Sequence, residues 1–178
     1  MSDPGAAPRP GPEHARLAPF VGRWETRGEV LGDGSTPAVE FAGTDEYEWL
    51  PGGFFLLHRV DVQMGGERVQ ALEVIGWDGE RGEYVARSYD HRGGEEVMHA
   101  ALRDGTWTFV GDASRFTGGF GEGGDTLSGR WERREGDRWL PWMDVRLRKA
   151  RRSTSGEAAG RRARSSPATH PQNEVVDV

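Results

Sequence analysis

About ten short segments of alternating apolar and polar residues, separated by glycine-rich turns, fill the chain from residue 21 to residue 149. Because successive side chains of a strand point to opposite faces, each segment predicts a β-strand with one apolar face. The connections are too short for crossover helices, which favours an antiparallel meander. The expected strands are 21–31, 38–50, 54–63, 68–77, 83–90, 95–102, 106–111, 114–120, 126–135 and 138–149.

A flat sheet of this many strands would expose two edges, whereas a closed barrel has none. We therefore expect an all-β, up-and-down antiparallel barrel, with a two-sheet sandwich as the alternative. Residues 12–19 (PEHARLAP) predict a short helix before the first strand, since Pro12 suits the first helical position. A small barrel of this kind usually encloses a pocket.

The composition of the two ends predicts that only the middle of the chain folds. The hydrophobic content is 35% and the mean hydropathy is -0.72, both low for a packed domain of 178 residues. Residues 1–12 are rich in Pro, Gly and Ala, and residues 151–178 contain no aromatic side chain. We expect both ends to be disordered and the barrel to span residues 13–150.

Charge and composition exclude several classes of partner. Residues 151–178 carry five Arg against three acidic residues, so the net charge of -6 leaves residues 1–150 strongly acidic and poorly suited to nucleic acid. The absence of cysteine excludes disulfides and thiolate metal sites. No signal-peptide pattern or membrane-length apolar run is present. We expect a cytoplasmic monomer or homodimer that binds neither nucleic acid nor membrane.

Three ionisable residues fall on otherwise apolar strand faces, namely Asp45, His58 and Glu73. A buried charge is costly unless it is paired, so each should meet a partner or a ligand. Together with their expected partners, they form a predicted ligand-binding set of Asp45, Tyr47, His58, Glu73, Arg115 and Arg146.

The role of His58 stays open at this level. It could bind a ligand, act as a general base with Glu73, ligate a metal or haem, or be a core histidine satisfied by its neighbours. The spacing of these residues matches no metal motif, so no metal site is predicted. Gly118–Gly124 precedes no helix and contains no Lys, which favours a mobile hairpin at the barrel mouth over a phosphate loop.

Several segments, taken in order, resemble a known group of barrels. Residues 17–25 (LAPFVGRWE) resemble the opening of the lipocalin-like, or calycin, barrels, and residues 47–56 (YEWLPGGFFL) resemble an uncharacterised bacterial lipocalin-like family. Later landmarks are similar at residues 75–78, 89–90, 115–116 and 129–132. The resemblance covers about residues 15–149. It implies a ten-stranded barrel similar to nitrobindins and fatty-acid-binding proteins, with no assigned reaction.

The same resemblance implies structural roles. In calycins the Trp of a Gly-x-Trp motif closes one end of the barrel, and an Arg of the last strand packs across it, which points to Trp24 with Arg146 or Arg148. Nitrobindin-like relatives bind haem through a late-strand His. The last strand has no His here, so we expect no cofactor, and a haem protein is kept as an alternative.

These observations predict a barrel that binds a small, largely apolar molecule, entered from the end carrying Gly118–Gly124. One alternative is an isomerase or hydrolase that acts on a small hydrophobic substrate through His58 and Glu73. A scaffold with a filled core is another. No nucleophile or other catalytic signature is present.

Overall fold

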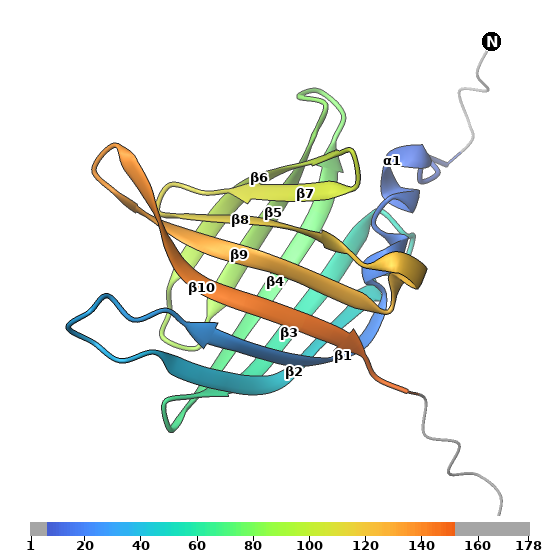
Figure 1. Ribbon diagram of the computed structural model, residues 1–178. Helices are drawn as coiled ribbons and strands as arrows, with labels where there is room; N and C mark the ends of the chain where they lie inside the picture. Colours follow the sequence, from blue (N-terminus) through green and yellow to red (C-terminus); the bar gives the residue numbers. More distant parts are fainter. Residues whose placement is uncertain (1–6, 152–178) are drawn as a thin grey trace, which may run out of the picture.

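The computed structural model describes residues 7–151, and its strands close into a barrel (Figure 1). A short helix α1 (Pro12–Ala15) and a 3-10 helix η1 (Ala18–Phe20) precede the strands, and a second 3-10 helix, η2 (Glu122–Gly124), follows β8. The strands are β1 (Gly22–Val30), β2 (Val39–Trp49), β3 (Phe55–Met64), β4 (Glu67–Asp78), β5 (Glu83–Asp90), β6 (Glu95–Arg103), β7 (Thr106–Val110), β8 (Ser114–Phe120), β9 (Thr126–Glu135) and β10 (Arg138–Lys149).

Each strand pairs antiparallel with the next, and β1 also pairs with β10, from Trp24 opposite Lys149 to Val30 opposite Met143. This closure confirms the predicted ten-stranded barrel and its short N-terminal helix, and it replaces the sandwich alternative. The predictions of disorder for residues 1–12 and 151–178 stay predictions, since residues 1–6 and 152–178 lie outside the described residues.

The turns use the backbone conformations that their sequences favour. At the β6–β7 hairpin, Asp104 has φ 49° and Gly105 has φ 78°. Two consecutive positive φ values are typical of a tight type I′ hairpin turn, for which Asp-Gly is a preferred pair. The turn therefore fixes the register of β6 and β7 locally.

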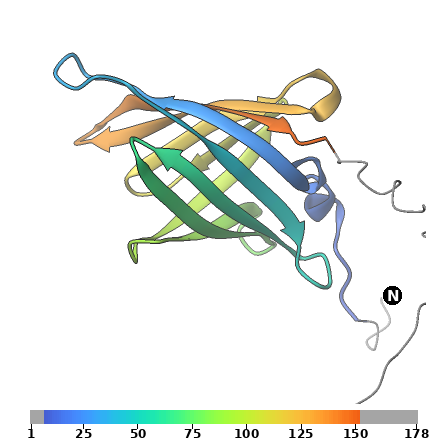
Figure 2. The same cartoon turned by 90° about the horizontal axis from the view of Figure 1, so that it is seen from below.

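One end of the barrel is filled by the N-terminal helical segment (Figures 1 and 2). Leu17 is fully buried there, and Phe20 is 2% exposed. The Phe20 ring lies 5.3 Å from that of Tyr47 and 4.9 Å from that of Phe120. The buried Trp24 donates its indole N–H to the Phe20 carbonyl over 2.7 Å. This apolar plug closes the barrel at the η1 end.

The cation over Trp24 is Lys149, whose Nζ lies 4.9 Å from the ring centroid. The expectation of Arg146 or Arg148 in this place is wrong. Alternation along β10 directs both arginines outward, where they are exposed, while Leu147 between them is buried. The register that sets Lys149 opposite Trp24 brings the lysine to the indole.

Phe116 fills part of the interior beside two glycines. A Cβ atom at Gly118 or Gly129 would collide with its ring, so these glycines leave the space that Phe116 occupies. Comparable packing does not extend through the whole barrel, and the space that remains forms a cavity.

We expect Trp24→Ala to lower the free energy of unfolding by about 3–5 kcal/mol, because truncating a buried aromatic side chain removes its packing and leaves a void. Chemical denaturation measures this loss. The control is Trp139→Ala, since Trp139 is half-buried against Arg115 and should lose much less. A Trp24→Ala protein with the denaturation midpoint of the wild type would contradict the closing role.

Candidate ligand-binding site

A cavity of about 560 Å³ occupies the barrel interior. Most of its lining is apolar, and its inner limit includes Phe20 of the plug. At the opposite end it reaches the exposed side chains of Glu67, His91 and Arg92, which lie near the β3–β4 and β5–β6 turns. The cavity therefore opens at the end of the barrel away from η1.

The prediction that the cavity opens beside Gly118–Gly124 is wrong. Phe120 at the end of β8 packs against Phe20 and Trp24, so this hairpin lies at the plugged end. The start of the same strand, Ser114, lines the cavity. The glycine content suggested a mobile mouth, but the apolar plug decides which end is closed.

A polar cluster lies within the cavity around His58. Its Nε2 lies 2.6 Å from Asp45 Oδ1, and its Nδ1 lies 3.1 Å from Glu73 Oε2. Thr26 donates its hydroxyl to the other oxygen of Asp45. The Tyr47 ring stacks on the imidazole at 3.9 Å between centroids, with 6° between the planes. Four neighbouring strands thus supply one hydrogen-bonded cluster.

Strand pairing explains why these residues meet. Tyr47 and Glu73 are the register partners of His58 on its two sides. Directly opposite residues of antiparallel strands have neighbouring side chains on the same face. The inward positions of Asp45, Tyr47, His58 and Glu73 agree with the alternation of the sequence, whereas their role in binding stays a prediction.

His58 is cationic near neutral pH. Burial lowers its pKa, but the hydrogen bonds and charges of Asp45 and Glu73 outweigh burial and raise the pKa to about 9. Burial raises the pKa of Tyr47 well above its usual value, and the charges of the same two carboxylates add to this, so the phenol stays neutral. The His58 imidazolium therefore offsets one of the two carboxylates that bind it.

This arrangement limits the chemistry open to His58. Both ring nitrogens are occupied by carboxylates, so neither offers a lone pair for proton abstraction or for iron. His58 therefore does not fit the role of haem ligand. Within residues 7–151, no group of three or more His, Cys, Asp or Glu is placed to hold a metal ion.

Arg115 and Arg146 do not belong to the cluster. Arg115 Nε donates to Glu132 over 2.7 Å, and its guanidinium lies 4.9 Å from the Trp139 ring. Arg146 is exposed on the outer face of β10. Neither residue lines the cavity, so their prediction as partners of Asp45, His58 and Glu73 is wrong. In both strands it is the neighbouring positions, such as Phe116 and Leu147, that point inward.

Sequence reasoning missed a second polar group in the cavity. Glu96 accepts hydrogen bonds from the Ser114 hydroxyl, with both of its oxygens 2.9 Å away, and Ser88 lies 3.4 Å from its backbone carbonyl. All three residues line the cavity. The signal was present, because Glu96 shares a strand face with the apolar Met98.

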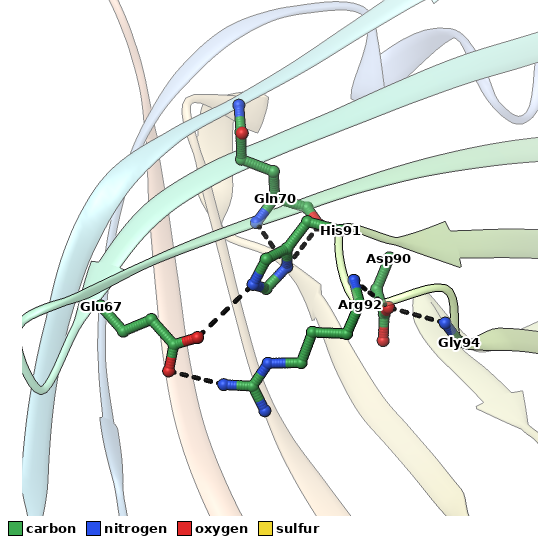
Figure 3. A network of polar contacts seen from close by, with 6 residues as sticks. All are labelled: Glu67, Gln70, Asp90, His91, Arg92 and Gly94. Carbon is green, nitrogen blue, oxygen red and sulfur yellow. Dashed lines mark hydrogen bonds and ion pairs between the residues drawn. The ribbon is translucent and has the colours of Figure 1, made fainter.

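The mouth carries a polar network (Figure 3). Glu67 binds Arg92 Nη2 over 2.5 Å and lies 3.6 Å from His91 Nε2. The hydrogen bond from Arg92 holds the pKa of Glu67 below its usual value. Asp90 accepts the backbone N–H groups of Arg92 and Gly94, each over 2.8 Å. These contacts tie the start of β4 to the β5–β6 turn at the rim.

Comparison with known proteins places this barrel in a family. Residues 9–101 match the model of a family described as "Protein of unknown function (DUF1579)". The chain belongs to the DUF1579 family. This agrees with the expected family of unknown function, while the wider relation to lipocalins and calycins stays a prediction. A search of curated proteins found no match.

Two solved structures are similar to this chain at low sequence identity. The crystal structure of Rv2717c from M. tuberculosis is 14% identical with a TM-score of 0.58, and the match covers 79% of this chain and 99% of that chain. A de novo designed fluorescence-activating β-barrel is 16% identical with a TM-score of 0.43, covering 75% of this chain and 96% of its own. No helix in the described part of the chain is long and apolar enough to cross a membrane.

The raised pKa of His58 makes the stability of the barrel depend on pH. This contribution is fully present below the ordinary pKa of 6.5 and is lost as the pH rises through about 9. Between about pH 6 and pH 10 the free energy of unfolding should fall by about 3 kcal/mol more in the wild type than in His58→Gln, at about 1.4 kcal/mol per pKa unit.

Urea denaturation across this pH range measures the difference. His99→Gln is the matched control, because the His99–Glu83 pair is solvent-exposed and should leave the wild-type pH dependence intact. The same pH dependence in the wild type and in His58→Gln would show that the cluster does not hold the proton.

Proposed function

We propose that this protein binds a small, largely apolar molecule inside its barrel. The observation that carries the proposal is the cavity of about 560 Å³, plugged at the η1 end and open at the other, with a buried polar cluster on its wall. Ligand pockets commonly have volumes of about 300–1,000 Å³ and combine an apolar lining with a few placed polar groups.

The apolar and the polar residues that line the cavity would contribute to binding in different ways. Apolar side chains such as Val62, Ile75 and Phe109 would remove the body of the ligand from water, which is the main favourable contribution to binding. The polar cluster around His58 would fix the orientation of a polar head, because buried polar groups favour ligands that satisfy them. The unfilled volume supports a binding protein over a scaffold with a filled core.

Acid–base catalysis by His58 and Glu73 receives less support. A general base needs an accessible lone pair, and both nitrogens of the protonated His58 are held by carboxylates. A reaction would require the cluster to rearrange first. We therefore propose binding without a reaction.

Titration with Nile red, a neutral apolar fluorophore, tests the proposal. The full chain should bind one molecule with a rise in fluorescence. Ala71→Trp should weaken this binding at least about tenfold, because Ala71 lines the cavity and the larger side chain would occupy it. Ala42→Trp is the matched control, since Ala42 is exposed on the outside of β2 and the variant should bind like the wild type.

Two results would contradict the proposal. One is the absence of saturable Nile red binding to the folded wild type. The other is equal affinity for the wild type and a folded Ala71→Trp protein, which would place the dye on the outer surface, where Leu72 and Tyr89 are exposed.

A further inference from the structure

The charged residues that line the cavity are mostly acidic. Five carboxylates line it, against Arg92, Arg133 and protonated His58, so two negative charges are not offset, and a proton on His91, which lies 3.6 Å from Glu67 at the mouth, would offset one of them. If His58 were neutral, three would remain. The acidic side chains are Asp45, Glu67, Glu73, Asp90 and Glu96.

The cationic side chains lie mainly at the mouth. Arg92 is exposed and pairs with Glu67. Arg133 is also exposed, and its guanidinium lies 4.0 Å from the Trp142 ring. The inner cluster has only His58 to offset Asp45 and Glu73, so one negative charge remains there.

Two polar atoms of the inner cluster have no hydrogen-bond partner among the described residues. Glu73 uses Oε2 to bind His58, and its Oε1 accepts no hydrogen bond. Tyr47 is only 7% exposed, lines the cavity, and has an unpartnered hydroxyl. Because Tyr47 and Glu73 are the register partners of His58 on either side, both lie beside the imidazole. Neither atom is fully buried, so both are open to a molecule that occupies the cavity, and such a molecule could satisfy them.

Of the side chains that the structure describes, only the Tyr47 hydroxyl offers an anionic head group a free donor beside the imidazole. The two N–H groups of protonated His58 already donate to Asp45 and Glu73, and the Thr26 hydroxyl donates to Asp45. A ligand carboxylate would also lie close to two like charges, which is unfavourable in a buried site.

We infer that the ligand of this cavity carries a protonated amine on an otherwise apolar body. The ammonium N–H groups would donate to Glu73 Oε1 and to the Tyr47 hydroxyl oxygen, and the positive charge would offset the remaining negative charge of the cluster. This inference rests on the proposed function, because it specifies the class of molecule that the same cavity binds.

The test compares three molecules that share one apolar tail. Octylamine, octanol and octanoate compete with Nile red for the full chain near neutral pH. Octylamine should bind at least about tenfold more tightly than octanol, and octanoate should bind most weakly.

Variants of single residues test whether the Glu73 carboxylate is the charge that binds the ammonium group of octylamine. Glu73→Gln keeps the side-chain shape and should weaken octylamine binding at least about tenfold, with octanol affected less than about twofold. Glu46→Gln, on the exposed outside of β2, makes the same change in net charge and should leave octylamine binding unchanged. Tyr47→Phe keeps the stacked ring and should weaken only octylamine. It also serves as a second test if Glu73→Gln fails to fold.

The outcomes separate the two proposals. If neither Nile red nor any of the three molecules binds, the proposed function fails. If Nile red binds but octanol or octanoate competes as well as octylamine, or none of the three competes, the amine inference fails while cavity binding stands. Equal losses of octylamine affinity in Glu73→Gln and Glu46→Gln would also overturn the inference, because they would indicate general attraction to an acidic surface.

Discussion

The pairing of β1 with β10 is the constraint on which the rest of the molecule depends. It joins segments more than a hundred residues apart and gives the first and last strands partners for their backbone groups. It also makes the interior a single compartment, so that side chains from distant strands meet around one cavity. The same register brings Lys149 to Trp24 at the plugged end.

The Asp45–His58–Glu73 cluster places charged groups in an otherwise apolar interior. Removing charges from water is unfavourable, and one of these two carboxylates remains unbalanced even when His58 carries a proton. Hydrogen bonds from His58 and Thr26 reduce the penalty without removing it. A buried cluster with a residual charge, beside unfilled volume, supports the proposal that a bound molecule completes the site.

The two ends of the barrel differ in chemistry as well as in openness. The plug is apolar and aromatic, built from Leu17, Phe20 and Trp24. The mouth is polar, and Glu67 beside the β3–β4 turn pairs there with both His91 and Arg92 of the β5–β6 turn (Figure 3). A ligand would therefore enter past a charged rim, cross an apolar wall and reach a second polar region at the inner cluster.

Much of the fold and part of the candidate site could be predicted from the sequence. Alternation placed the strands to within one or two residues of their observed bounds, and it placed Asp45, Tyr47, His58 and Glu73 inside. The same rule could have found Glu96, which shares a face with Met98. These features are local, because the side-chain period of a strand is set by its own backbone.

The remaining features depended on contacts between distant segments. In β10 both faces carry apolar residues, so only closure against β1 determined that Val145 and Leu147 point inward and Arg146 outward. The docking of the N-terminal segment determines that the η1 end of the barrel is the closed one. It also places Lys149, and no arginine of β10, against the face of the Trp24 ring. Alternation determined which face is interior in the strands that have one apolar and one polar face, which β10 does not. Only tertiary packing decided which residues share a register and which end of the barrel is open, because those depend on segments that no local pattern connects.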